Sequence, residues 1–280
     1  MKKQILILLL LFSVSSIFAQ KEKVKQKTWL PSGVAAFNLS QLALSNWSQG
    51  GDNSLAFSII GNFGLKYYSN PWKFENSLKI SFGKSKIGDQ EFRIADNEIF
   101  MQNMLSYSVG WVVDPYISNI FRTVVTNGFD YGVSPALQTS AFFDPGYLQQ
   151  GMGFTYQHIP GWNFRAGLGF KETFTSKFNS YADDPATTEI EKTKFETGLE
   201  FGVAGKTELQ KNILFQTDLG LFSAFNALDV WDVRWDNTLT VKLSDLFNMN
   251  VNVLVIYDAD QTLKTQIKEA LQLGITYTLF

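Results

Sequence analysis

Long segments in which apolar and polar residues alternate are the feature that most constrains the fold of this chain. Residues 55–67 place leucine, phenylalanine, isoleucine and tyrosine at odd positions, and mostly small or polar residues at even positions. After a short turn at 69–71, residues 72–82 alternate again. A helix cannot separate such sets onto two opposite faces, whereas a strand does so with its period of two. The alternation therefore predicts strands that are apolar on one side and polar on the other.

The same pattern recurs and predicts about twelve strands along the chain. Many of these segments span about ten residues, which exceeds the length usual in soluble sheets and suits tilted membrane strands. In the first strand the alternation slips, and we expect a bulge near Gln41. The expected strands cover residues 34–44, 55–67, 72–82, 99–111, 119–131, 147–157, 162–174, 193–205, 212–225, 232–243, 249–258 and 267–280.

The connections between these strands alternate in length, which fixes an orientation. Long connections are expected at 45–53, 84–97, 132–146 and 175–192, and short ones at 69–71, 112–118, 158–161 and 206–211. We therefore predict an all-β fold, a single antiparallel transmembrane β-barrel with short periplasmic turns and longer extracellular loops. An aromatic girdle is expected at the short-turn rim, formed by Tyr67, Trp72, Trp111, Tyr156, Trp162 and Tyr277.

The N-terminal residues have the layout of a secretory signal. Residues 1–19 combine two lysines, a short apolar core and a small-residue cleavage region, so we predict a cleaved signal peptide. The alternative, a membrane anchor, needs about 20 apolar residues. A polar periplasmic lead-in is expected at 20–32 and the barrel at 33–280, in a bacterial outer membrane. The chain has no cysteine, which excludes a lipoprotein and disulfides, and its net charge of -2 gives no footprint for nucleic acid.

The last stretch, residues 267–280, is expected to close the barrel against the first strand. Its odd positions from Leu271 to Leu279 are apolar and its even positions are polar or small. An apolar strand edge is tolerated in a membrane when it pairs and closes the sheet. The expected partners are therefore outer-membrane lipid and the barrel-assembly machinery, although the apolar set is offset by one from the usual pattern counted back from Phe280. The oligomeric state is left open.

Charged residues within the strands are expected to point into the lumen, because a charge that faces lipid costs about 2–4 kcal/mol at mid-membrane. Two interpretations remain open: ion pairs that brace or plug the barrel, and a polar channel that sorts solutes by charge. Cross-lumen pairs of Lys79 or Arg165 with Glu196 or Glu200 would favour a plug. The predicted lumen charges are Lys66, Lys73, Glu75, Lys79, Arg122, Arg165, Lys171, Glu196, Glu200, Asp218, Arg234, Asp236, Lys242 and Lys268.

Catalytic and cofactor patterns are weak, so we expect neither an enzyme nor a cofactor. The single histidine, His158, falls at a short turn and has no evident nucleophile partner. The glycine pairs at 151–153 and 167–169 lie within strands, where they ease crowding rather than bind phosphate. The acidic loop 183–191 lacks EF-hand spacing and is expected to be solvated, with weak calcium binding left open. Asn46 begins a formal glycosylation sequon.

Several stretches carry a resemblance to a known family. They are LSNWSQGGDNS at 44–54, FFDPGYL at 142–148, KETFTSK at 171–177, TTEIEK at 187–192 and DVRWDNTL at 232–239. In these the chain resembles a family of Bacteroidota outer-membrane β-barrel proteins that is known only as a domain of unknown function. The resemblance implies a barrel in that membrane and no activity.

Four functional hypotheses follow from the sequence. The leading one is a narrow or gated pore for small polar solutes, because the lumen is charged. The second is a non-conducting structural or interaction barrel, plugged by side chains, that binds through its extracellular loops. An outer-membrane enzyme acting on lipid and a soluble secreted β-sandwich are weaker alternatives.

Overall fold

The computed structural model describes residues 27–45, 48, 51–184 and 186–279. The expected signal peptide, most of the lead-in, the sequon residue Asn46 and the terminal Phe280 lie outside the described residues. Within the described part, twelve antiparallel strands form a closed barrel in the order β1-β14-β13-β12-β11-β10-β9-β8-β5-β4-β3-β2. This confirms the predicted fold class.

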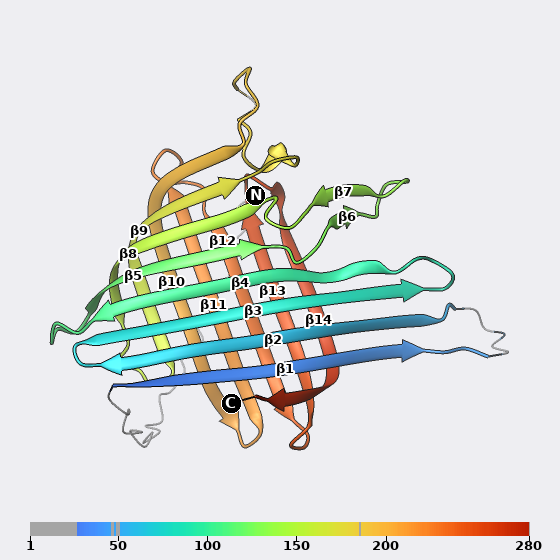
Figure 1. Cartoon of the computed structure of the whole chain (residues 1–280), viewed down its shortest axis with the longest axis horizontal. Coiled ribbons are helices and arrows are strands. Elements are labelled where there is room, and N and C mark those ends of the chain that lie inside the picture. The colour runs from blue at the N-terminus through green and yellow to red at the C-terminus, as the bar shows by residue number, and fades with distance from the viewer. Residues whose placement is uncertain (1–26, 46–47, 49–50, 185, 280) are drawn as a thin grey trace, which may run out of the picture.

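The barrel strands are long and follow one another around the wall (Figure 1). They are β1 Thr28–Leu42, β2 Ser54–Ser69, β3 Trp72–Ile87, β4 Arg93–Tyr107, β5 Asp114–Thr123, β8 Gly146–Tyr156, β9 Trp162–Phe174, β10 Thr193–Gln210, β11 Ile213–Ala224, β12 Asp232–Lys242, β13 Phe247–Asp258 and β14 Thr262–Thr278. A separate two-stranded sheet, β6 Gly128–Asp130 and β7 Leu137–Ser140, and the short 3-10 helix η1 Asn179–Tyr181 belong to the connections.

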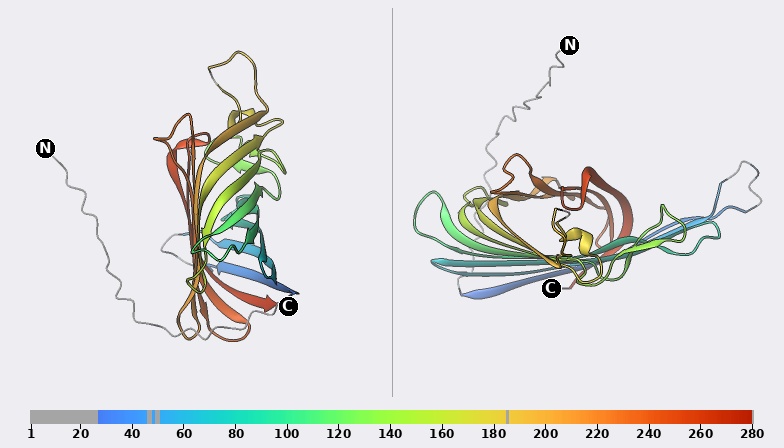
Figure 2. Two further views of the ribbon diagram at one scale, coloured as in Figure 1. Left: turned by 90° about the vertical axis from the view of Figure 1, so that its left-hand side faces the viewer. Right: turned by 90° about the horizontal axis from the view of Figure 1, so that it is seen from above.

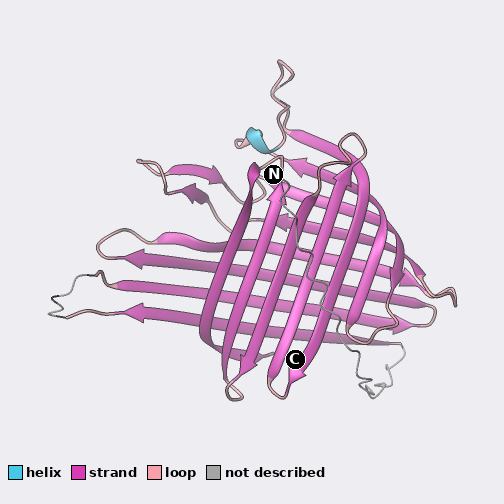
Figure 3. Cartoon of the chain, turned by 180° about the vertical axis from the view of Figure 1, so that it is seen from behind, coloured by secondary structure: helices cyan, strands magenta, loops and turns pink. Residues whose placement is uncertain are grey.

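The barrel has two walls whose strands run in different directions. Strands β1 to β5 run across the view of Figure 1, whereas β11 to β14 run steeply behind them. Seen from above, the cross-section is flattened, so the two walls face each other across a narrow interior (Figure 2). The β6–β7 hairpin projects to one side of the barrel (Figure 3). A flattened barrel brings side chains from opposite walls within reach of each other.

Burial in this molecule is inverted relative to a soluble protein. The described residues include six buried apolar residues and fourteen buried polar or charged ones. The alternation places apolar side chains outside and polar side chains inside, which is the arrangement of a barrel surrounded by lipid. No helix among the described residues is long and apolar enough to cross a membrane. Large apolar residues exposed on the barrel include Ile59, Ile117, Met152, Phe154, Leu168, Phe195, Trp235, Leu271 and Ile275.

Several predicted strand ends are wrong. β1 begins at Thr28 rather than at residue 34, and it pairs with β2 in unbroken register through Gln41, so the expected bulge is absent there. β3 and β4 are joined by residues 88–92, so the long loop expected at 84–97 is mostly strand. The acidic residues of 93–98 resemble a loop in sequence, but inside the barrel they meet cations from the opposite wall. β5 likewise occupies Asp114–Thr123 instead of 119–131.

The barrel closes between β1 and β14, as the sequence predicts. The register runs from Val34 opposite Thr278 to Asn38 opposite Gly274, and the Leu279 amide donates to the Gly33 carbonyl. Gly274 is needed at this seam, because a Cβ there would collide with the Asn38 side chain. The closing strand starts at Thr262, five residues earlier than expected.

Aromatic residues gather at the short-turn rim. The ring centroids of Trp72 and Tyr107 lie 4.8 Å apart, and those of Trp29 and Tyr67 lie 4.7 Å apart. Trp29 was assigned to the lead-in by its sequence, but it belongs to this rim. Such rings suit the boundary between lipid and water.

Candidate functional site

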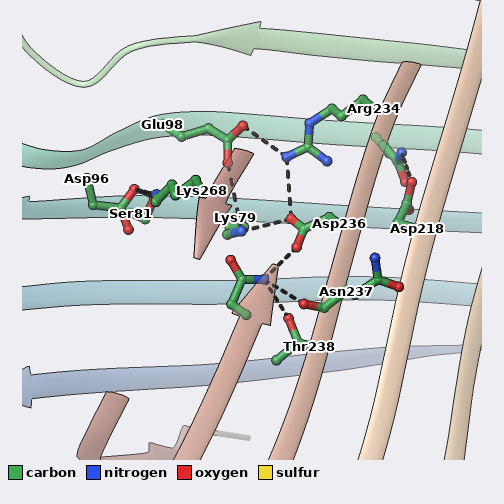
Figure 4. Close-up of polar contacts among 12 residues, drawn as sticks. Lys79, Ser81, Asp96, Glu98, Asp218, Arg234, Asp236, Asn237, Thr238 and Lys268 are labelled. Atoms are coloured by element: carbon green, nitrogen blue, oxygen red, sulfur yellow. Dashed lines mark hydrogen bonds and ion pairs between the residues drawn. The ribbon is translucent and has the colours of Figure 1, made fainter. Parts of the chain in front are cut away.

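The interior of the barrel is crossed by charged side chains that join its two walls. Lys79 of β3 contacts Asp236 of β12 with an Nζ–Oδ2 distance of 3.0 Å, although β2, β1, β14 and β13 separate these strands in the sheet. Arg234 of β12 likewise reaches Glu98 of β4, at 2.9 Å between Nη2 and Oε1. Such contacts can form only across the lumen. We refer to these four residues as the central ion-pair layer (Figure 4).

The central ion-pair layer alternates cations and carboxylates. Besides these two cross-lumen contacts, Lys79 lies 3.8 Å from Glu98 and Arg234 lies 3.4 Å from Asp236. The Arg234 guanidinium also stacks on Phe100, with Cζ 4.1 Å from the ring centroid. Two cations and two carboxylates balance each other, so the layer is electrically neutral. The attraction between opposite charges offsets the cost of removing each of the four groups from water, a cost that an unpaired charge would bear in full.

Amide and hydroxyl groups extend this layer. Asn252 of β13 donates to the Asp236 carboxylate at 2.6 Å. Lys268 of β14 reaches Asp96 of β4 at 2.6 Å, and Ser81 donates to the same carboxylate at 2.9 Å (Figure 4). Lys268 thereby joins β14 to β4 past β1, β2 and β3. Side chains therefore connect the two walls at more than one place along the barrel.

A second cluster surrounds Lys171 near the long-loop end. Its ammonium contacts Asp232 at 2.6 Å and Asp258 at 3.4 Å, and it also lies within 4 Å of Glu196 and Asp260. Lys171 is almost fully buried, and it is the ion-pair partner of Asp232 and Asp258 among the described residues. Lys194 supplies a second cation to Glu196 and Asp260.

A third cluster lies toward the short-turn end. Glu75 of β3 is contacted by Lys66 at 3.1 Å and by Lys73 at 2.9 Å. Lys73 also donates to Gln157, which follows β8, three strands along the sheet from β3, at 2.5 Å. These contacts place two lysines, a carboxylate and an amide together at the short-turn end of the barrel.

Glu200 of β10 is the most deeply buried carboxylate and forms no ion pair among the described residues. Tyr116 of β5 donates to its Oε1 at 2.5 Å, and Gln149 of β8 donates to its Oε2 at 3.0 Å. Gly151 makes room for this side chain, because a Cβ there would overlap the carboxylate. Both oxygens are therefore satisfied by neutral donors.

The predicted lumen charges have different partners from those expected. Neither Lys79 nor Arg165 pairs with Glu196 or Glu200. Lys79 pairs with Asp236 and Glu98 instead, and Arg165 forms no ion pair in the described residues. Lys242 pairs with Asp245 in its own turn, at 3.0 Å.

Sequence reasoning missed several interior residues. Asp96 and Glu98 were placed in a loop or ahead of a strand, and Tyr116 was placed in a turn. Each lies on the same face of its strand as polar residues two positions away. Extending the strand pattern outward would therefore have found them. The other missed groups are Lys194, Asp232, Asn252, Asp258 and Asp260.

The acidic loop uses its carboxylates to hold its own backbone. Asp183 accepts from the Glu191 amide at 3.1 Å, and Glu191 accepts from the Thr187 hydroxyl at 2.6 Å and from the Asp184 amide at 3.1 Å. The Thr187 hydrogen bond, followed by the Asp184 amide, lowers the pKa of Glu191 to about 2. Among the described residues no group of three or more candidate ligands has a metal-binding arrangement. His158 lies in the turn after β8, with its ring 5.3 Å from that of Tyr156.

Cavities remain between the clusters in the described part of the barrel. The inner cavity, of about 100 Å³, is lined by residues that include Phe100, Arg122, Arg165, Lys171, Asp232 and Asp258. The outer cavity, of about 360 Å³, lies between residues 94–98 and the β13–β14 end of the barrel. Arg122 lines both cavities.

These features define a closed, twelve-stranded antiparallel β-barrel with an ion-paired interior. A family model described as a protein of unknown function (DUF3078) matches residues 39–129, which is under half of the chain. The match agrees with the expected resemblance to a family of unknown function, whereas the Bacteroidota affiliation stays a prediction.

Comparison with solved structures finds outer-membrane barrels. An outer membrane channel from Pseudomonas putida F1 is similar with a TM-score of 0.39 and 11% identity, over 94% of this chain and 99% of that one. The translocator domain of the autotransporter NalP from Neisseria meningitidis gives 0.37 and 10% identity, over 89% and 87%. The KdgM porin gives 0.31 and 10% identity, over 89% and 99%. No curated protein matches the chain.

Proposed function

We propose that this protein is an outer-membrane β-barrel whose lumen is closed in the resting state and which acts through its outer end. The observation that carries the proposal is the central ion-pair layer, in which Lys79 and Glu98 of one wall meet Arg234 and Asp236 of the other. Ions that move through this level must break contacts between buried charges, which costs several kcal/mol per uncompensated ion. A barrel braced in this way resists free diffusion.

The membrane placement is supported by the inverted burial and tested by position-dependent charge insertion. Leu168 is exposed near the middle of β9, and Leu263 is exposed at the outer end of β14. Leu168→Arg should lower the free energy of unfolding in lipid vesicles by about 2–4 kcal/mol, and Leu263→Arg by about 0–1 kcal/mol. Equal losses in the free energy of unfolding for the two variants would contradict the placement of the middle of β9 at the centre of the membrane.

Lumen closure is tested by conductance. The purified barrel in planar lipid bilayers should give no steady channel current, and liposomes that contain it should not take up small polar solutes. A large, permanently open channel would refute the closed lumen. Because insertion must be shown independently, protease protection of the periplasmic turns serves as the control.

A gated pore for small polar solutes is the second candidate, and one observation favours it. The two cavities share Arg122, Tyr147 and Ile256, so the interior has space that reaches from the outer end toward the central ion-pair layer. A gate predicts that Asp236→Asn raises conductance, while Asp245→Asn, in an exposed turn, leaves it unchanged. Unchanged closure in both variants would favour the structural barrel.

The outer connections are the proposed interaction surface. The largest described connections at that end are residues 124–145, which contain the β6–β7 hairpin, and residues 175–192. Deletion of either loop should abolish binding to an extracellular partner while the barrel still folds. The C-terminal strand is proposed to be recognised by the barrel-assembly machinery, which is tested by replacing Leu271 and Leu273 with serine and measuring insertion. No catalytic role is proposed for His158.

A further inference from the structure

Two arginines stand out in the interior because neither forms an ion pair within the described part of the chain. Arg122 of β5 stacks on Tyr147, with its Cζ 4.3 Å from the ring centroid. The Nε atom of Arg165 on β9 is buried and lacks a hydrogen-bond partner. Every other lysine or arginine predicted to lie in the lumen contacts a carboxylate. A buried N–H donor without an acceptor, such as the Arg165 Nε, is costly unless something supplies one.

The position of Arg165 is built into the wall. Its guanidinium lies over Gly202 of β10, where an added Cβ would come within 2.5 Å of Arg165 Cζ. Glu200, two residues away on the same strand, would be a natural partner. However, both of its oxygens already accept hydrogen bonds from Tyr116 and Gln149. The chain thus provides a place for the Arg165 guanidinium, while the Glu200 carboxylate is hydrogen-bonded to neutral donors instead.

Both arginines line the inner cavity, whose lining includes four cations and three carboxylates. Its volume of about 100 Å³ is several times the roughly 10–15 Å³ that a cavity needs to hold one water, so a small oxyanion fits. The carboxylates of the wall have other partners: Asp232 and Asp258 contact Lys171, and Asp218 accepts from Gln102 at 3.5 Å. The charged groups that line the cavity are Arg122, Arg165, Lys171, Arg234, Asp218, Asp232 and Asp258.

A route to this cavity starts at the outer end of the barrel. The outer cavity, of about 360 Å³, shares Arg122, Tyr147 and Ile256 with the inner one. Arg122 lines both cavities, whereas Arg165 lines the inner one and not the outer one. The central ion-pair layer contributes Arg234 to the inner cavity wall. The path needs no passage through the whole barrel.

We propose that the inner cavity is a binding site for a small oxyanion held between Arg122 and Arg165. Guanidinium groups present paired donors that match the oxygens of carboxylate, nitrate or phosphate. The flanking aromatic rings of Phe100 and Tyr147 exclude water and strengthen these bonds. The site is independent of conduction, because a closed barrel can fill it from outside.

The test measures anion binding to the full-length mature barrel in a zwitterionic detergent. Isothermal titration with sodium phosphate and with sodium nitrate, in a buffer free of other oxyanions, should show saturable binding of at least one of them. Arg165→Gln and Arg122→Gln should each weaken it by about ten-fold or more. Lys242→Gln, which removes the same charge from an exposed ion pair, should leave the affinity within about two-fold.

Two further measurements keep the outcome decisive if a variant folds poorly. Arg165→Lys retains the charge and loses the paired donors, so it should bind more weakly than the wild type while its unfolding midpoint stays close. The 15N chemical shift of Arg165 Nε should move on titration with the anion and stay fixed with sodium chloride at equal ionic strength. Absence of binding by the wild type to both anions, or unchanged affinity in Arg165→Gln, would overturn the proposal.

Discussion

The substitution Asp236→Asn tests whether the central ion-pair layer behaves as a buried network. Asp236 forms an ion pair with Lys79 at 3.0 Å. Asp245, in the turn after β12, forms an ion pair with Lys242 at the same distance and serves as the exposed comparison. The two pairs differ in exposure: the aspartate side chains are 13% and 98% exposed. Asp→Asn keeps the shape and removes the charge, so the comparison isolates the effect of the environment.

The expected magnitude follows from the remaining partners. Breaking a buried ion pair costs about 3–5 kcal/mol, but Glu98 stays within 3.8 Å of Lys79 and 2.9 Å of Arg234. It partly neutralises both cations, so we expect Asp236→Asn to lower the free energy of unfolding by about 2 kcal/mol. Asp245→Asn should change it by about 0.5 kcal/mol or less.

Urea unfolding in phospholipid vesicles, followed by tryptophan fluorescence, measures this difference. With a slope of roughly 2 kcal/mol per molar urea, the midpoint of Asp236→Asn should fall by about 1 M while that of Asp245→Asn stays in place. A double-mutant cycle of Asp236→Asn with Lys79→Met should give a coupling of about 1–3 kcal/mol. Equal midpoints for the two single variants would refute a desolvated layer in the lumen.

Three other perturbations test separate parts of the molecule. Thr187→Val removes the hydrogen bond that holds the pKa of Glu191 at about 2, so an NMR titration should show this pKa moving toward 4.5. Because the pKa is depressed, the stabilisation of the loop is complete above pH 4.5 and is lost as the pH falls toward 2. Tyr116→Phe leaves one oxygen of the buried Glu200 unsatisfied and should lower the free energy of unfolding by about 1–3 kcal/mol in urea. Lys171→Met leaves its carboxylates without their shared cation and should cost about 3–5 kcal/mol in the same assay.

Matched variants serve as controls for these three perturbations. Thr265→Val removes a hydroxyl from an exposed position in β14 and should leave the Glu191 titration unchanged. Tyr107→Phe, at the exposed rim, and Lys242→Met, in the exposed turn, should each alter unfolding by about 0.5 kcal/mol or less. If Tyr116→Phe or Lys171→Met behaves like its control, the corresponding interior group is hydrated and the assigned contact carries no stability.

Strand alternation was sufficient to predict the barrel and its approximate strand count. The period of two is a local property of the backbone, and it appears wherever one face meets lipid and the other meets the lumen. The boundaries of β9 were predicted correctly for this reason. The early strands were placed less well, because acidic residues such as Asp96 and Glu98 look like loop residues until their partners are known.

The pairing of the interior charges could not be read from the chain. Lys79 and Asp236 are separated by 157 positions, and nothing local links them. Expected partners such as Glu200 are satisfied instead by neutral donors from β5 and β8. Which cation meets which carboxylate depends on the flattening of the barrel and on the stagger between its walls.

The sequence by itself determined which face of each strand is polar, that the chain closes on its last strand, and that charges must collect inside. Each of these follows from the cost of exposing charge or unpaired backbone to lipid. Only the tertiary structure decided that the lumen is bridged at the central ion-pair layer and that Arg122 and Arg165 are left beside a cavity. Those outcomes depend on distances across the barrel, which the order of residues along one strand does not specify.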